Sequence, residues 1–111
     1  MKEGDVILGS LLQSDGKWKI RPVICLREMP PFGDMLVCGI STQLRHEIPG
    51  FDEMISIDAP DFQSTGLREA SLVRLGFLGI LSTKDLAGSL GSISTERHRR
   101  LLERLSEYLI G

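Results

Sequence analysis

Residues 19–26 read Lys-Ile-Arg-Pro-Val-Ile-Cys-Leu, an apolar run that an arginine and a proline open. Proline has no N–H group and is tolerated at the first residue of a strand rather than inside a central one. The pattern therefore predicts a buried strand from Pro22 to Leu26, with Arg21 immediately before its first residue. A guanidinium held at the end of a rigid strand is suited to binding a phosphate or a carboxylate. The position alone is equally compatible with an ordinary surface arginine.

Short apolar runs separated by turn residues lie on both sides of this strand. The predicted strands span residues 6–12, 22–26, 35–40, 54–58, 70–75 and 79–81. The predicted turns span residues 14–17, 30–34 and 64–66, which are rich in Gly, Pro, Asp and Ser. Five or six short strands broken by turns predict a small antiparallel barrel.

The last third of the chain predicts two helices. Ser82 could cap a short helix, with Asp85 in its first turn, and Gly88 or Gly91 would end it. A longer helix begins after Ser94 or Thr95 as N-cap. Its apolar residues recur at spacings of three and four and form one stripe: Leu101, Leu102, Leu105, Tyr108 and Leu109. The fold class is therefore mainly β (α+β), a single domain over residues 1–111 with a helix packed on a barrel.

The overall charge limits the partners that the chain can have. The formal net charge is −2 and the isoelectric point about 5.6, which argues against broad, unspecific duplex binding. A local basic groove remains compatible, because Arg21, Arg45, Arg68 and Arg74 all lie outside the terminal helix. No apolar run approaches the roughly 20 residues of a membrane helix, and the N-terminus lacks the layout of a signal peptide. We expect a cytoplasmic protein that does not enter membranes.

The cysteine and histidine content indicates no metal site and no cofactor. Cys25 and Cys38 each lie inside an apolar run, which is typical of small buried hydrophobes rather than of a disulfide. His46 and His98 are too few and too far apart to suggest zinc. The sequence also lacks a serine-hydrolase elbow, a phosphate-binding loop and a dinucleotide fingerprint.

Three polar clusters near strand ends are candidates for chemistry: Arg21 with the loop 14–19, Ser41-Thr42-Gln43, and Ser71 with Arg74. Arginine and hydroxyl groups suit phosphate-ester chemistry, because preorganised donors stabilise charge that builds on phosphate oxygens. RNA supplies its own nucleophile in the 2′-OH, so such a set needs no protein nucleophile. For the last two clusters, an ordinary strand end and an ordinary alternating strand are the competing interpretations.

The order of these motifs resembles the PemK/MazF family of toxin endoribonucleases along almost the whole chain. The matching pieces are Gly4-Asp5-Val6, Ser14-Asp15-Gly16, Arg21-Pro22-Val23, Ile40-Ser41-Thr42-Gln43, Gly66-Leu67, Ser71-Leu72-Val73-Arg74 and the terminal helix. The resemblance implies an SH3-like barrel that forms homodimers. It also implies a toxin that cuts single-stranded RNA without metal, leaving 2′,3′-cyclic phosphate and 5′-hydroxyl ends. A separate antitoxin chain would neutralise it.

The resemblance also assigns candidate roles to individual residues. Arg21, Ser41 and Arg74 match the catalytic positions of the family. The candidates for holding the RNA are Lys17, Lys19, Thr42, Gln43, His46 and Ser71. Gly76 is a departure, because some family members carry an aspartate there as a candidate base, and the segment 76–80 departs from the family's usual continuation. His46 is the one histidine near the expected site and could serve as the base instead.

Two alternatives stay open at this stage. A toxin of the same barrel fold can act without catalysis, as the CcdB toxins do by clamping DNA gyrase, or as a decayed copy that binds RNA; Gly76 motivates this alternative. A generic SH3-like interaction domain ranks third, since it needs an aromatic groove and aromatic residues make up only 5% of the chain.

Overall fold

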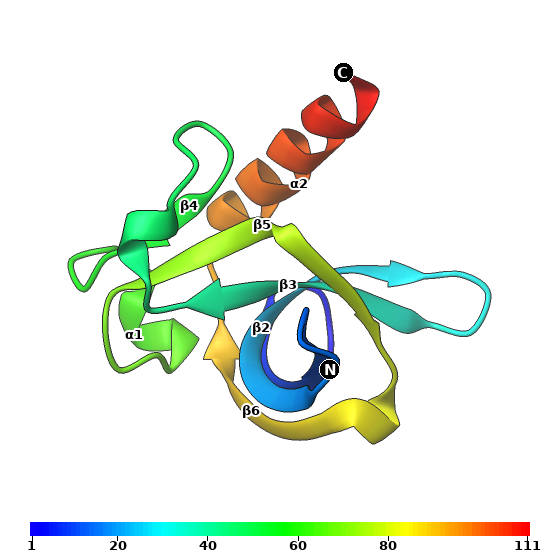
Figure 1. Ribbon diagram of the computed structural model, residues 1–111. Helices are drawn as coiled ribbons and strands as arrows, with labels where there is room; N and C mark the ends of the chain where they lie inside the picture. Colours follow the sequence, from blue (N-terminus) through cyan, green and yellow to red (C-terminus); the bar gives the residue numbers. More distant parts are fainter.

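The computed structural model describes residues 1–111 and shows one antiparallel sheet with a helix across it (Figure 1). The strands are β1 (Asp5–Leu12), β2 (Trp18–Met29), β3 (Asp34–Ser41), β4 (Glu53–Ile55), β5 (Ser71–Leu81) and β6 (Leu86–Ser92). The α-helices are α1 (Phe62–Thr65) and α2 (Thr95–Ile110), and single 3₁₀ turns span Leu44–His46 and Thr83–Asp85. The predicted mainly β fold with a terminal helix is confirmed.

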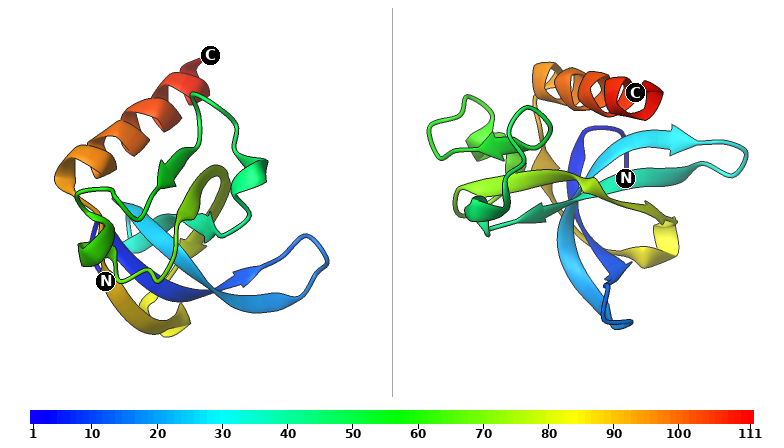
Figure 2. Two further views of the ribbon diagram at one scale, coloured as in Figure 1. Left: turned by 90° about the vertical axis from the view of Figure 1, so that its left-hand side faces the viewer. Right: turned by 45° about the horizontal axis from the view of Figure 1, so that its top comes forward.

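The sheet is curled, and its strand order is β4-β5-β3-β2-β1-β6. The curl brings β6, at one edge, back to α1, which follows β4 at the other edge; Ser64 Oγ donates to the carbonyl of Ser92 at 3.0 Å. The views in Figure 2 show the strands wrapping around the interior, with α2 lying across one open side. None of the helices combines the length and the hydropathy needed to cross a membrane.

The sheet is buried on both of its faces. Successive side chains of a strand point to opposite faces, yet Val6 and Ile7 are both buried, as are Val23 and Ile24. One face packs in a cluster with Leu101 and Leu105 of α2, and the other fills the inside of the curl. This double burial explains why the central strands read as continuous apolar runs.

Cys25 and Cys38 are free thiols in the interior, as predicted. Burial raises the pKa of Cys25 to about 11 and that of Cys38 to about 12. Both side chains therefore stay protonated and pack as small apolar groups.

Pro22 does not begin its strand, so that prediction is wrong. β2 begins four residues earlier, at Trp18, and pairs with β1 from there. Its pairing with β3 begins only at Val23. Pro22 thus lies where the strand has a neighbour on one side, and a residue without an N–H is tolerated beside an open edge.

The second half of the chain differs from the prediction at three further places. The two predicted strands 70–75 and 79–81 are one strand, β5, with a bulge between them. The predicted strand 54–58 contracts to Glu53–Ile55, and the predicted turn 64–66 ends the short helix α1. Gly66 closes that helix in the left-handed conformation, with φ of 74°.

The helix predicted after Ser82 is a single 3₁₀ turn, and the following residues form β6. The capping pair that suggested a helix is present, since Ser82 N donates to Asp85 Oδ2 at 2.9 Å. The chain then pairs with the free edge of β1, and Gly88 lies opposite Leu8. At Gly91 a Cβ atom would collide with the carbonyl oxygen of Ser64, so only glycine permits this close approach.

Helix α2 is capped as predicted, because Ser94 Oγ accepts from Arg97 N at 3.1 Å. Only part of its apolar stripe is buried. Leu101 and Leu105 are buried, but Tyr108 and Leu109 lie exposed near the C-terminal end of the helix. Arg97 is buried and ion-pairs with Asp61 at 2.8 Å. The guanidinium of Arg97 also pairs with Glu53, so the start of α2 is bound to both α1 and β4.

Candidate functional site

A cleft of about 420 Å³ opens where four segments meet: the β1–β2 turn, the end of β3, the 3₁₀ turn after it and the bulge of β5. Its lining residues are Gln13, Ser14, Arg21, Gly39, Ile40, Ser41, Gln43, His46, Arg74, Gly76 and Phe77. In the left view of Figure 2, the β1–β2 hairpin and the loop after β3 project to the same side of the molecule. Five of the nine predicted site residues line this cleft.

The strand register explains why Arg21, Ser41 and Arg74 converge. Gly39 of β3 pairs with Val23 of β2 on one side and with Arg74 of β5 on the other. Extending the β2–β3 register by two residues places Arg21 opposite Ser41. Residues two apart on a strand share a face, so three neighbouring strands present these side chains on one surface.

A glutamine holds the guanidinium of Arg21. Arg21 Nε donates to Gln13 Oε1 at 2.9 Å, and Gln13 Nε2 donates to the carbonyl of Leu11 at 3.1 Å. The two terminal nitrogens of Arg21 make no bond within the protein, and no carboxylate pairs with it. Gln13 was not among the predicted site residues, because an amide beside a turn carries no distinguishing sequence signal.

The bulge of β5 positions Arg74 over an aromatic ring. Cys38 pairs with Leu78 while the next residue, Gly39, pairs with Arg74, so residues 75–77 have no partners on β3. Arg74 Cζ lies 5.9 Å from the centroid of the Phe77 ring. That ring lies over Gly39, where a Cβ atom would come within 2.9 Å of it. The glycine thus gives Phe77 the room to support Arg74.

A buried carboxylate, Asp52, joins the two walls of the cleft. Asp52 Oδ1 accepts from the N–H of Leu75, inside the bulge, at 3.1 Å. Asp52 Oδ2 accepts from the N–H of Ile48, in the loop that follows His46, at 2.9 Å. The bulge frees an N–H that β3 does not satisfy, and Asp52 satisfies it. Its role depends on contacts remote in sequence, so no local sequence pattern marks it.

Ser41, Gln43 and His46 form the rim next to Arg21. Ser41 Oγ accepts from Gln43 N at 3.0 Å, which leaves its O–H free to donate to a ligand. Gln43 and His46 are exposed, and His46 N donates to the Gln43 carbonyl at 3.1 Å. The rim therefore offers a hydroxyl, an amide and an imidazole to whatever enters the cleft.

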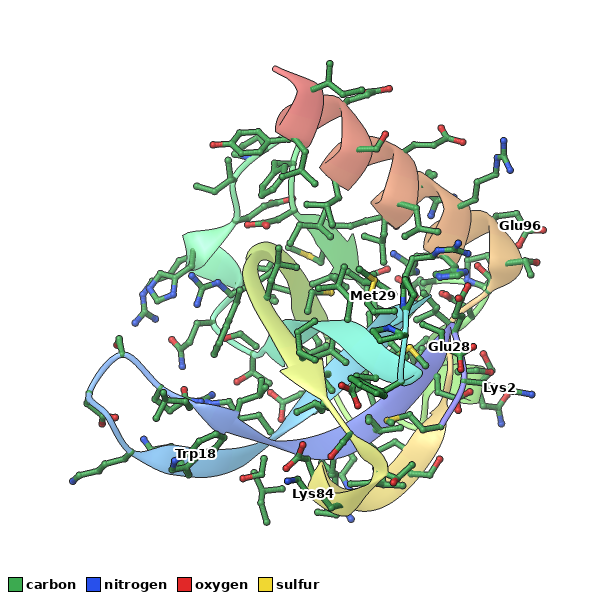
Figure 3. All side chains as sticks on the ribbon, turned by 90° about the vertical axis from the view of Figure 1, so that its right-hand side faces the viewer. Lys2, Trp18, Glu28, Met29, Lys84 and Glu96 are labelled. Carbon is green, nitrogen blue, oxygen red and sulfur yellow. The ribbon has the colours of Figure 1, made fainter.

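The other four predicted site residues lie outside the cleft. Thr42 lines a neighbouring pocket. Ser71 is 2% exposed, and its hydroxyl donates to the carbonyl of Glu69 at 2.9 Å. Lys17 and Lys19 are exposed on the β1–β2 hairpin beside Trp18, which Figure 3 labels.

The composition of the cleft selects for an anionic ligand. Its lining includes two guanidinium groups without a carboxylate partner, and no Asp or Glu. Planar guanidinium forks bind phosphate oxygens through paired N–H bonds. The arrangement can hold a phosphate group between Arg21 and Arg74 and stabilise negative charge that develops on it.

The fold is similar to that of a known toxin. The solved structure of the Mycobacterium tuberculosis toxin MazF-mt6 matches with a TM-score of 0.69 and 21% sequence identity, covering 96% of each chain. No protein-family model and no curated protein sequence matches the chain. The structural match confirms the MazF-like fold, which the motif order predicted.

Proposed function

We propose that this protein, which has the MazF-like fold, is the toxin of a type II toxin–antitoxin pair and cleaves single-stranded RNA without a metal ion. One observation carries the proposal. Arg21, Ser41 and Arg74, which lie far apart in the sequence, line a single cleft without carboxylates. That donor set fits a phosphodiester, and RNA brings its own nucleophile.

The reaction is an internal transfer within the RNA backbone. The ribose 2′-oxygen attacks the adjacent phosphorus, the new O2′–P bond forms and the P–O5′ bond breaks. The 2′-hydroxyl proton passes to a base, and the departing 5′-oxygen takes up a proton. The products are a 2′,3′-cyclic phosphate and a 5′-hydroxyl, and no water or metal is consumed.

Each cleft residue has a place in this reaction. The guanidinium groups of Arg21 and Arg74 stabilise the charge on the pentavalent phosphorus centre, and the Ser41 hydroxyl donates to a phosphate oxygen. Arg74 also lies where it can donate toward the leaving oxygen. His46 is the candidate base, since histidine is the side chain that most often serves as a general base.

The remaining candidates bind RNA outside the reacting centre. Gln43 holds the strand at the rim, and Lys17 and Lys19 attract its phosphates from the hairpin. Thr42 contacts the nucleotide in the neighbouring pocket. Ser71, which also lines that pocket, supports it through the loop that its hydroxyl fixes.

A homodimer and an antitoxin complete the proposal. The outer face of the β1–β2 hairpin exposes Leu12, Trp18 and Ile20, which are 53%, 65% and 63% exposed, and a second copy would cover them. The antitoxin would be a separate chain with an acidic, partly disordered tail that folds over the arginines of the cleft. The protein would work in the cytoplasm, where mRNA is available.

The test compares the parent with Arg21→Ala on a long single-stranded RNA in EDTA. We expect discrete cuts with 5′-hydroxyl ends from the parent, and a loss of about 10²–10³ in rate from the variant. Arg45→Ala removes an exposed arginine outside the cleft lining and should cut like the parent. Equal cleavage by Arg21→Ala and the parent would rule out the assignment.

A second function rests on Gly76, which leaves the cleft without a carboxylate base. A non-catalytic toxin of this fold would bind RNA in the same cleft or clamp a protein target. Intact RNA after incubation with a well-folded parent would favour this alternative. Retention of that RNA on the protein would then separate RNA binding from protein clamping.

A further inference from the structure

A second pocket, of about 340 Å³, adjoins the cleft and shares Ile40 and Ser41 with it. Its walls are largely apolar and come from four strands and a loop: Leu8, Pro22, Ile40, Leu67 and Leu90. If an RNA phosphate is held at Ser41, a group bound in this second pocket would belong to the neighbouring nucleotide of the RNA. Apolar walls with a few polar groups at the rim are typical of sites for flat heterocycles.

The loop that forms one wall of this pocket is held in place before any ligand arrives. Gly66 is in the left-handed conformation and packs so closely on the carbonyl of Leu90 that no other residue fits. Leu67 N donates to Thr65 Oγ1 at 3.2 Å, and Ser71 Oγ donates to the carbonyl of Glu69 at 2.9 Å. Residues 67–70 are thus fixed at both ends.

This fixed loop presents two opposite charges that have no partner in the protein. Arg68 and Glu69 line the pocket and are exposed. Neither side chain takes part in any ion pair or side-chain hydrogen bond of the molecule, and most of the ion pairs involve residues of α2. Arg68 therefore offers only hydrogen-bond donors, and Glu69 offers only acceptors.

We propose that this pocket binds a guanine base, that of a nucleotide flanking the phosphate in the cleft. The proposal rests on RNA being the ligand of the cleft. Guanine has two adjacent donors, N1–H and the N2 amino group, which match the two oxygens of the Glu69 carboxylate. It also has two adjacent acceptors, O6 and N7, which arginine recognises in pairs.

The other bases match this pair of side chains less well. Adenine and cytosine each offer one exocyclic amino donor to the carboxylate, and uracil offers one ring N–H. None of them has both a donor pair and an acceptor pair. Thr42, at the rim, can donate or accept and does not by itself select a base.

The first test measures binding without cleavage. The probes are oligouridylates with one central G, A or inosine and with 2′-deoxyribose throughout, so that no 2′-OH can attack. Fluorescence anisotropy should give about tenfold tighter binding for G than for A, the effect of one good paired contact. Inosine lacks the N2 amino group and should bind between the two. Equal affinity of the parent for G and A would overturn the proposal.

The second test assigns the preference to the two rim residues. Glu69→Gln should reduce the preference for G over inosine to within about twofold. Arg68→Gln should weaken the binding of the G probe more than that of the A probe. Glu107→Gln, an equal charge change on α2 away from both pockets, should keep the parent's preference. An unchanged G preference in Glu69→Gln would overturn the role of Glu69.

The cleavage pattern separates this proposal from the proposed function. Cuts by the parent on a random RNA should show G enriched at one position beside the cut, and Glu69→Gln should reduce that enrichment. If the parent binds G-containing probes selectively but cuts nothing, the nuclease proposal fails and the guanine site stands. If it cuts RNA without any preference for G in binding or cleavage, the guanine site fails alone.

Discussion

Gly76 lines the cleft at a position where the proposed RNA cleavage would gain from a carboxylate base. A Cβ atom at this position would meet only Phe51 Cε2, at 3.8 Å, an ordinary van der Waals contact. Its φ is not positive, so a side chain causes no backbone strain there. The position is also exposed and lines the cleft beside Arg74.

We therefore expect Gly76→Asp to fold normally and to speed RNA cleavage by about tenfold or more, since a positioned base contributes at least that much. Initial rates across pH 5–8 test this, with Gly76→Asn as a control of equal size without the charge. A slower Gly76→Asp enzyme with an unchanged melting temperature would show that the bulge does not face the 2′-hydroxyl.

The main residues that line the cleft were predictable, and their supports were not. Arg21, Ser41 and Arg74 stand in short motifs whose order is informative, and strand register then brings them together. Gln13 and Asp52 act through hydrogen bonds to single partners, and nothing in their local sequence marks them. Ser71 stands in a motif as well, but its hydroxyl is turned to the backbone rather than to the cleft.

At the scale of elements, the bulge of β5 depends on Asp52. In Asp52→Asn, the amide NH₂ faces a backbone N–H, so one of the two donors loses its acceptor at a cost of about 1–3 kcal/mol. We expect the bulge to shift and kcat to fall at least tenfold, with a smaller change in KM, because Arg74 is displaced from the transition state.

Steady-state kinetics and urea unfolding together test the role of Asp52. Asp58→Asn, at an exposed turn, is the matched control and should leave both kcat and stability unchanged. Reduced stability with unchanged kcat would make Asp52 a purely structural residue.

The attachment of α2 has a pH dependence of known sign. Burial raises the pKa of Asp61, but hydrogen bonds from Arg97 and from the N–H of Ser94 outweigh it and hold the pKa below its ordinary 3.8. A carboxyl with a lower pKa in the folded state stabilises the protein above its unfolded pKa. That contribution is lost as the pH falls through the folded value.

We expect Asp61→Asn to lower the free energy of unfolding by roughly 3 kcal/mol near neutral pH, because it leaves Arg97 buried with one carboxylate fewer. The difference from the parent should shrink as the pH falls from the ordinary Asp pKa of about 3.9 through the lower folded pKa of Asp61, because the carboxylate's contribution is lost over that interval. Urea titrations at several pH values measure both effects, and a pH-independent difference would contradict the explanation.

The elements that were mispredicted are those that tertiary pairing decides. Residues 86–92 contain two glycines and two serines, which have little tendency to form a strand, and yet they become β6 because β1 has a free edge. The central strands and α2 were predictable, since their apolar periodicity coincides with their burial. The helix α1 has only four residues, too few for any periodic signal.

At the scale of the whole molecule, the apolar outer face of the β1–β2 hairpin predicts self-association. Trp18 is 65% exposed and stands between two lysines. We expect the parent to sediment as a dimer of the 12.3 kDa chain, and Trp18→Glu to sediment as a monomer. Leu109→Glu, an equally exposed apolar position at the end of α2, should remain dimeric. A dimeric Trp18→Glu variant would exclude this face.

The central claim is that the cleft uses the RNA's own 2′-hydroxyl as the nucleophile, without metal. The direct measurement places a single 2′-deoxynucleotide 5′ to a mapped cut in an otherwise unchanged RNA, in EDTA. We expect that this site is no longer cut, while neighbouring sites still yield 2′,3′-cyclic phosphate and 5′-hydroxyl ends. Cleavage at the deoxy site, or ends with a 5′-phosphate, would contradict it.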